Sequence, residues 1–412
     1  MNQKLTLCLK TLIVPFIAVL LSSCNINTSE SAKTEEKTLQ TIQFADILEQ
    51  DTLLRCSDIA KTIHYVPLES KPEAFFNRVN EVQISKEYFF ISDFKQLYQF
   101  KRTGEFVRKI GSNGKGPGEY LYVVSLDINE DLREVYVFCN VSRKVLIYDF
   151  EGNHLRSYAM PQFRTLRAVD DSLFLAYTDV AVGKEEHIFT LIDAAGDSTC
   201  LVKNNFKWEH ISDMVYTVYT GNRWFYRYGG KLYFKDIYND TLYRYNPDKY
   251  LAEPTYYFDL GKYDIPDLKR VSYIVNEDLN KYKTYCDEYY QFNVLESDAF
   301  LFIDYFNYCL RDQNRKYGVF DKSTQKLYTL VNDQGEPTQI LNDFTGGMDL
   351  WATTISDKQL FNFLYPHQLK TYYEENGEGN EAIQPGKKEE IEQLSRSLST
   401  DDNPIVRILE LK

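Results

Sequence analysis

The stretch Gly104-Glu-Phe-Val-Arg-Lys-Ile-Gly-Ser-Asn-Gly-Lys-Gly-Pro-Gly-Glu-Tyr120 indicates how the whole chain is built. A short strand, expected over Glu105–Ile110, is followed by a loop with several glycines, and a second alternating run starts at Tyr120. Short alternating runs bounded by turn-forming residues are typical of antiparallel strands. The stretch therefore marks the crossing from one unit of a repeated β-structure to the next.

One complete unit precedes this loop. Its strands are expected over Glu81–Ser85, Tyr88–Ser92, Gln96–Phe100 and Glu105–Ile110, and short turns join them. Four antiparallel strands in a span of about 30 residues are typical of one blade of a β-propeller.

The third strand of this unit recurs along the chain. Equivalent residues are Phe100, Tyr148, Ile192, Tyr245 and Phe320. The first three spacings, of 48, 44 and 53 residues, lie close to the period of roughly 40 to 50 residues found in propeller blades. The second strand recurs independently, at 90–93, 137–140, 233–236 and 302–304. With a last blade from about residue 341 to Leu411, the sequence predicts an all-β, six-bladed propeller.

The remaining segments are expected to be short additions to the blades. An amphipathic helix expected over 266–279 accounts for the long fourth spacing, and a second helix is expected over 387–398. A strand over 405–411 closes the chain, and Ile63–Val66 is expected to complete the last blade and to remove its open edge. A further strand is expected over Thr41–Leu48.

Composition agrees with a β-rich protein and argues against one class of partner. The chain has 412 residues, of which 15% are aromatic, with 33 Tyr and 26 Phe, and both residue types favour pleated, half-buried surfaces. The formal charge is -13, and no cluster of Lys and Arg forms a footprint for nucleic acid. No nucleic-acid partner is expected.

The N-terminus carries the pattern of an export signal. Lys4 and Lys10 precede the apolar run 12–21, which is too short to span a bilayer and is typical of a signal peptide. The run ends in Leu21-Ser-Ser-Cys24, which resembles a bacterial lipobox; the alternative is an ordinary secretory signal that contains a cysteine. We expect a lipoprotein signal peptide over 1–23, a flexible tether over 24–40 and the propeller over 41–412. A multiply acylated Cys24 would anchor the protein to a membrane of the cell envelope, either on the periplasmic side of the outer membrane or at the surface.

The cysteines do not indicate a disulfide framework. Beyond Cys24 the chain contains Cys56, Cys139, Cys200, Cys286 and Cys309, an odd number without a Cys-x-x-Cys pair. Cys286 with Cys309 is the one bridge to test, and buried free thiols are the alternative that we favour.

Several of these pieces resemble one family. The stretch 104–120 resembles the blade-to-blade segment of NHL-type propellers, and the chain as a whole resembles the six-bladed β-propeller lipoproteins of Bacteroidota, an NHL/TolB-like group. The matching pieces are Tyr65–Glu69, Gly116–Tyr120, Asp236–Arg244, Phe258–Gly261 and Asn403–Arg407. The resemblance covers roughly residues 40 to 412. It implies an exported, lipid-anchored propeller, and it supplies no catalytic residues.

No catalytic constellation or cofactor motif is found. Gly114-Lys115-Gly116 is not a phosphate-binding loop, because Pro117 and a following strand replace the required helix. The five histidines show no ligand spacing. We therefore assign no catalytic residue, no metal ligand and no cofactor.

Propeller geometry nevertheless predicts one candidate ligand face. The turn between the second and third strands of a blade lies at the same end as the crossing to the next blade. The face is therefore expected to hold Asp93, Asn113, Lys115, Glu119, Asn140, Asp236, Asn239 and Asp304. The alternative is that Asp and Asn serve only as turn formers. Trp208, Trp224, Trp351 and the stretch 282–308 could stack on sugars, although blade packing explains aromatic residues equally well.

Two functions remain open from the sequence. The first is a membrane-anchored module of the envelope that binds a glycan, a peptide or a partner protein. The second is a metal-assisted lyase or hydrolase that uses Asp93, Asp236 and Asp304. A third hypothesis, without a ligand, is a purely structural scaffold.

Overall fold

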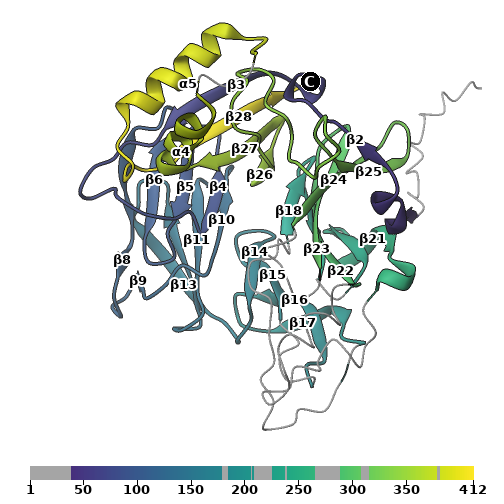
Figure 1. Ribbon diagram of the computed structural model, residues 1–412. Helices are drawn as coiled ribbons and strands as arrows, with labels where there is room; N and C mark the ends of the chain where they lie inside the picture. The colour runs from purple at the N-terminus through teal and green to yellow at the C-terminus, as the bar shows by residue number, and fades with distance from the viewer. Residues whose placement is uncertain are drawn as a thin grey trace, which may run out of the picture. The chain divides into compact units, whose positions relative to one another are not determined.

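Six mainly antiparallel sheets form the blades of a propeller in the computed structural model (Figure 1). It describes residues 39–178, 184–205, 207, 225–236, 239–264, 288–307, 315–377 and 381–412. The labels β10, β14, β18 and β26, which mark first strands of blades, lie toward the middle of Figure 1, and β13, β21, β25 and β3 lie outside. The predicted fold class is confirmed.

The first three blades are four-stranded and contiguous in sequence. Blade 1 contains β4 (Glu81–Ile84), β5 (Tyr88–Ser92), β6 (Leu97–Lys101) and β7 (Phe106–Ile110). Blade 2 contains β10 (Ser125–Asn129), β11 (Glu134–Cys139), β12 (Lys144–Asp149) and β13 (His154–Ala159). Blade 3 contains β14 (Thr165–Ala168), β15 (Leu173–Tyr177), β16 (His187–Asp193) and β17 (Ser198–Lys203).

The last three blades each include a strand from the N-terminal end of the chain. Blade 4 contains β18 (Phe225–Tyr228), β19 (Lys231–Phe234), β20 (Thr241–Asn246), β21 (Leu251–Asp259) and β1 (Gln40–Gln43). Blade 5 contains β22 (Tyr290–Glu296), β23 (Phe300–Asn307), β24 (Lys316–Asp321), β25 (Lys326–Leu330) and β2 (Asp51–Thr52). Blade 6 contains β26 (Thr354–Ser356), β27 (Gln359–Leu364), β28 (Ile405–Leu411) and β3 (Ala60–Pro67).

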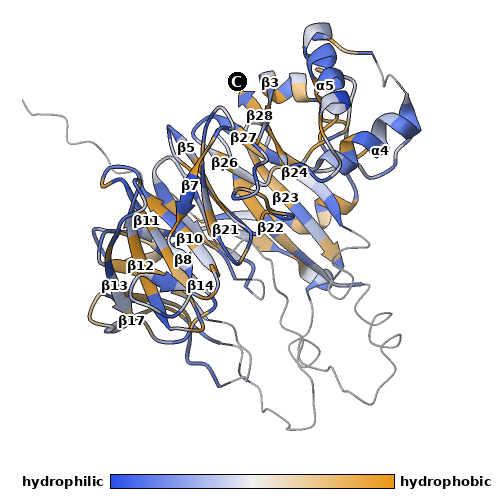
Figure 2. Ribbon diagram, turned by 90° about the vertical axis from the view of Figure 1, so that its left-hand side faces the viewer, coloured by the Kyte–Doolittle hydropathy of each residue, from blue (hydrophilic) through white to orange (hydrophobic). Residues whose placement is uncertain are grey.

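The sequence repeat corresponds to one strand position. Phe100, Tyr148, Ile192, Tyr245 and Phe320 lie in β6, β12, β16, β20 and β24, which are the third strands of blades 1 to 5. All five side chains are buried, because the faces of the sheet from which they project are covered. Figure 2 colours β11 and β12 largely orange, whereas the surface helices α4 and α5 are mostly blue or white.

An N-terminal strap, residues 40–67, runs along the outer edges of three blades. Its strand β1 pairs in parallel with β21, β2 pairs in parallel with β25, and β3 pairs antiparallel with β28. In Figure 1 this purple segment passes from β21 past β25 to β3. The predicted closing strand at Ile63–Val66 is thus confirmed, and it extends over Ala60–Pro67.

The predicted strand over Thr41–Leu48 is wrong in its second half. Only Gln40–Gln43 is a strand, and Phe44–Leu48 form a 3₁₀ helix, η1. Phe44 and Ile47 are fully buried, and the three-residue spacing places both on one side of such a helix. Phe44 packs on Phe292, with ring centroids 5.4 Å apart. Burial of this pair explains why the extended conformation ends at Gln43.

Short helices complete the described chain. They are α1 (Cys56–Ile59), η2 (Gly261–Tyr263), α4 (Pro366–Asn376) and α5 (Pro385–Ser397). The helix predicted over 387–398 is confirmed as α5, whereas α4, which begins with Pro366 in its first turn, was not predicted. The helix predicted over 266–279, Cys286 and Cys309 lie outside the described residues. Cys56, Cys139 and Cys200 are free thiols.

The glycine-rich crossing after β7 does not lead directly into the next strand. Ser112–Asn113 (β8) and Glu119–Tyr120 (β9) pair with each other in parallel, and β10 begins only at Ser125. The buried Tyr120 side chain donates a hydrogen bond to the Ile110 carbonyl at 2.5 Å. Tyr120 therefore folds the loop back onto its own blade, although the sequence predicts the next strand there.

The antiparallel order gives the blades two different ends. We call the connection face the end with the turns between second and third strands and the crossings between blades, for example Asp93 and Tyr122. We call the hairpin face the opposite end, with the other turns, for example Lys86 and Asp357. No helix in the described part of the chain is long and apolar enough to cross a lipid bilayer.

Candidate functional site

Two large aromatic side chains are exposed and stacked on the connection face. Phe94 lies in the turn between β5 and β6, and Tyr122 lies in the crossing from blade 1 to blade 2. Their ring centroids are 4.9 Å apart at an interplanar angle of 25°, and the residues are 39% and 37% exposed. The backbones are joined as well, since Val123 N–H donates to the Phe94 carbonyl at 2.7 Å. We call Phe94 and Tyr122 the aromatic pair.

Asp93 holds the turn that presents this pair. Its Oδ1 accepts hydrogen bonds from the backbone N–H of Lys95 at 2.9 Å and of Gln96 at 2.7 Å. Its Oδ2 accepts a hydrogen bond from the Tyr98 hydroxyl at 3.2 Å. Burial, and then the Asp93 carboxylate, raises the pKa of Tyr98, so the tyrosine remains a proton donor. Asp93 is therefore a positioning residue for Phe94.

Further exposed apolar residues lie in the neighbouring connections. Phe75, in the crossing from blade 6 to blade 1, is 43% exposed, and its carbonyl accepts a hydrogen bond from the Tyr98 hydroxyl at 3.3 Å. Val141 follows Asn140 in the β11–β12 turn and is 61% exposed. Large exposed apolar patches mark interaction sites, whereas single exposed apolar side chains are common on protein surfaces.

The predicted residues of the glycine-rich loop mostly support the loop itself. Glu119 accepts a hydrogen bond from Gly116 N–H at 2.7 Å, and Asn113 Nδ2 donates to the Leu121 carbonyl at 2.7 Å. A Cβ atom at Gly114 would lie within 2.0 Å of the Glu119 carboxylate, so that side chain would have to move to accept any other residue there. Lys115 remains exposed at the loop tip.

The predicted polar residues of blades 4 and 5 are largely buried or hold their own turn. Asp236 is 1% exposed and accepts a hydrogen bond from the Tyr177 hydroxyl at 2.8 Å. Asp304 lies within β23, not in the turn after it, and its Oδ2 is 2.8 Å from Arg315 Nη1. Asn239 Oδ1 accepts a hydrogen bond from Thr241 N–H at 2.9 Å. The structure thus places these three residues in blades 4 and 5, whereas the aromatic pair belongs to the connections of blades 1 and 2.

The carboxylates do not assemble into a metal site within the described ranges. No group of three His, Cys, Asp or Glu side chains there is arranged to hold a metal ion. The Asp93 carboxylate accepts the hydrogen bonds of its own turn, and Asp236 and Asp304 have the partners given above. No observation on the described residues favours the metal-assisted enzyme.

Charged side chains of the innermost strands link blades that are not neighbours in the chain. Arg167 on β14 lies 3.3 Å from the Glu81 carboxylate of β4 and donates to Ser125 Oγ of β10 at 2.7 Å. Arg227 on β18 lies 2.9 Å from the Asp127 carboxylate of β10. Each guanidinium therefore reaches from its own blade to the second blade before it.

Glu81 has the perturbed acidity in this group. Burial raises its pKa, the Arg167 charge lowers it, and the nearby Asp127 raises it further. A carboxyl with a raised pKa near other charges is a common mark of functional sites, so the pH dependence of stability is tested below for Glu81. The contacts of these charged side chains are also explained by a structural role, which is to link the blades.

Neither residue of the aromatic pair was predicted from the sequence, because the prediction of a ligand face relied on Asp and Asn in turns. A signal was present, because Phe94 occupies a turn where small or polar residues are usual. Trp351, considered for sugar stacking, is buried and packs on Phe302 and Tyr317 at centroid distances of 5.7 and 4.8 Å. Trp208 and Trp224 lie outside the described residues.

These features define the protein as a six-bladed β-propeller with an exposed aromatic pair at one end of its blades. The chain belongs to the DUF4934 family, a domain of unknown function, whose model matches residues 39–410. A comparison with curated proteins finds no match.

A solved structure shares the fold. The chain is similar to a Bacteroides fragilis protein thought to be exported, with 18% identity, a TM-score of 0.65, and coverage of 91% of this chain and 100% of that chain. A member of the DUF4221 family from Bacteroides vulgatus is 12% identical, with a TM-score of 0.48 over 86% of this chain and 97% of that chain.

Proposed function

We propose that this protein is an exported, lipid-anchored module of the cell envelope that binds a partner polypeptide through its connection face. The observation that carries the binding role is the stacked, exposed pair of Phe94 and Tyr122. Aromatic side chains that lie outside a core are typical anchors of protein interfaces. The exposed Phe75 and Val141 in neighbouring connections favour a polypeptide, since they place further apolar side chains at the same end of the blades.

The address rests on the N-terminal pattern. Residues 1–23 have the charge, apolar run and lipobox-like end of a lipoprotein signal, with Cys24 as the acylated residue. The similarity to a protein thought to be exported supports export. Metabolic labelling with a fatty-acid analogue tests the anchor: we expect label on the wild type and none on Cys24→Ala.

A site-specific photocrosslinker tests the binding role in the native cell. We expect a crosslinker at position 94 or 122 to give one discrete adduct, and Phe94→Ala to abolish the adduct formed from position 122. Tyr250 is the matched control position, because it is an exposed aromatic on the hairpin face. Equal adducts from positions 94 and 250 would count against the proposal. Saccharide binding that depends on Phe94 would instead assign the site to a glycan.

A further inference from the structure

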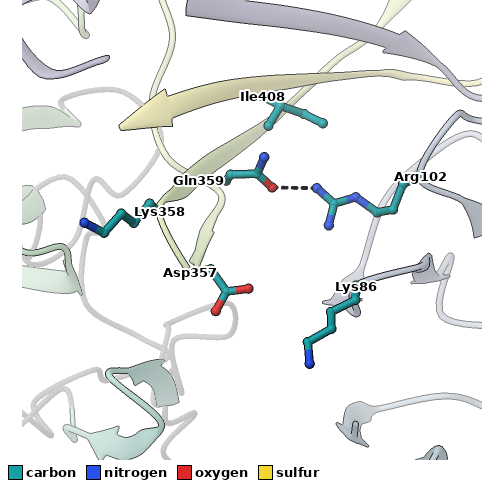
Figure 3. A pocket seen from close by; sticks show the side chains of 6 residues that line it. All are labelled: Lys86, Arg102, Asp357, Lys358, Gln359 and Ile408. Atoms are coloured by element: carbon teal, nitrogen blue, oxygen red, sulfur yellow. Dashed lines mark hydrogen bonds between the residues drawn. The ribbon is translucent and has the colours of Figure 1, made fainter. Parts of the chain in front are cut away.

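A pocket lies on the hairpin face, between blades 1 and 6. It has a volume of about 570 Å³ and is lined by Lys86, Arg102, Asp357, Lys358, Gln359 and Ile408 (Figure 3). Ligand pockets commonly have volumes of about 300 to 1,000 Å³. These residues come from the β4–β5, β6–β7 and β26–β27 turns and from β27 and β28. The pocket is therefore built where the first and last blades of the ring meet.

Arg102 is fixed in place before any ligand arrives. Its Nη1 donates to the Ser85 carbonyl at 3.0 Å, and its Nη2 donates to Gln359 Oε1 at 2.7 Å. The guanidinium carbon lies 4.8 Å from the ring centroid of Phe89 and 5.1 Å from that of Phe361. A guanidinium has five N–H donors, and these two bonds leave donors for a ligand. A side chain held in this way loses little conformational entropy on binding.

The pocket carries charges of both signs. In Figure 3 the Asp357 carboxylate faces the space between Lys86 and Arg102, whereas Lys358 points away from Arg102. Lys358 Nζ instead lies 3.5 Å from Asp298 Oδ2. Burial lowers the pKa of Arg102, and the Asp357 carboxylate opposes that shift, so the two charges act on each other. The group offers two cations for an acid and one carboxylate for an ammonium group.

We propose that this pocket binds a small zwitterion of the amino-acid or short-peptide class. Its carboxylate lies between Arg102 and Lys86, and its ammonium group lies on Asp357. A guanidinium is well suited to a carboxylate, because two of its N–H donors match the two oxygens. The Ile408 side chain provides an apolar wall for the rest of the ligand. A plain anion would meet the Asp357 carboxylate, so it fits less well.

Calorimetric titration of the purified protein with glycylglycine tests the proposal, with acetate and ethanolamine as probes of each charge alone. We expect glycylglycine to bind at least about tenfold more tightly than either single-charge probe. Asp357→Asn and Lys86→Ala each remove one exposed charge, and each should weaken glycylglycine binding about tenfold. The same substitutions at exposed hairpin-face positions, Asp248→Asn and Lys231→Ala, are the matched controls and should leave it unchanged.

Three results would overturn the proposal. They are no binding of glycylglycine up to about 10 mM, equal affinity for acetate, and unchanged affinity in Asp357→Asn. Because both tested side chains are exposed, thermal melts should show wild-type stability, and Arg102 is left intact because it joins the two blades. The pocket lies at the opposite end of the blades from Phe94, so this test and the crosslinking test can fail independently.

Discussion

Phe94 adopts a backbone conformation that phenylalanine rarely takes, with φ at +83°. A side chain with a Cβ atom in this region costs about 1 to 2 kcal/mol, which glycine avoids. We predict that Phe94→Gly leaves the free energy of unfolding within about 1 kcal/mol of the wild type, because relief of strain offsets the lost ring stack. The crosslinked adduct formed from position 122 should nevertheless disappear. Urea unfolding together with the crosslinking assay measures both effects.

Tyr250 provides the control for this prediction. It also has a positive φ, of +54°, and it is 59% exposed, but no ring partner is found for it within the described ranges. Tyr250→Gly should leave the adduct intact. A large loss of stability in Phe94→Gly would mean that the ring belongs to the packing and not to a binding surface.

Glu81 predicts a pH dependence with a definite sign. Because burial raises its pKa, the folded protein keeps this proton at pH values where the unfolded chain has already lost it. The contribution of Glu81 to stability is therefore greatest below the ordinary carboxyl pKa and decreases as pH rises through the raised value. In Glu81→Gln this decrease should be absent, so the variant gains relative to the wild type as pH rises across that window. Urea unfolding between about pH 4 and 8 measures the difference.

The exposed Glu87 is the control for the pH series. Glu87→Gln should differ from the wild type by a small, nearly constant amount, as expected for a surface ion pair. Parallel stability curves for Glu81→Gln and the wild type would contradict the prediction.

At the scale of elements, the N-terminal strap depends on a close approach at Gly318 in β24. A Cβ atom there would lie 2.5 Å from Ile47 Cδ1 and 2.6 Å from the Tyr328 carbonyl oxygen. We predict that Gly318→Ala destabilises the protein by about 1 to 3 kcal/mol, because η1 must move away from blade 5. Thermal or urea unfolding measures the change.

A double-mutant cycle separates the strap from the sheet. Ile47→Ala alone should cost about 2 to 5 kcal/mol, as for other buried aliphatic side chains. Since it also removes the colliding methyl group, the double variant should be more stable than the sum of the single effects predicts. Strict additivity would show that the collision with the Tyr328 carbonyl dominates.

At the scale of the whole molecule, the strap has two separable roles: residues 39–52 cover the edges of blades 4 and 5, and β3 completes blade 6. Removal of residues 39–52 takes away β1, η1 and β2 but keeps β3, the fourth strand of blade 6. We predict a folded monomer whose free energy of unfolding is lower by on the order of 5 kcal/mol, mainly because the burial of Phe44 and Ile47 is lost. Removal of residues 39–67 also exposes the edge of β28, and this chain should aggregate. Circular dichroism and size-exclusion chromatography distinguish the two outcomes, and a folded monomer lacking 39–67 would contradict the prediction.

The blade count could be read from the sequence because third strands are buried on both faces. Their apolar residues, such as Phe100 and Tyr148, therefore recur with a regular period. The strap strands do not share this period. The strand predicted over Thr41–Leu48 includes most of Gln40–Gln43, but its pairing with a strand far along the chain was not predicted, and Asp51–Thr52 is too short to show a pattern. Sequence alone did not distinguish turn residues that support a loop, such as Asp93, from turn residues whose side chains are exposed, such as Phe94.

The order of the strap strands along the chain has a mechanical consequence. Tension applied at residue 39 acts first on β1 and then on β2, and it reaches β3 only after both have detached. The seven register pairs between β3 and β28 are therefore protected from the applied force by two shorter strand pairings with other blades, which break first. A protein pulled by its N-terminus would lengthen in steps while the circle of blades stayed shut.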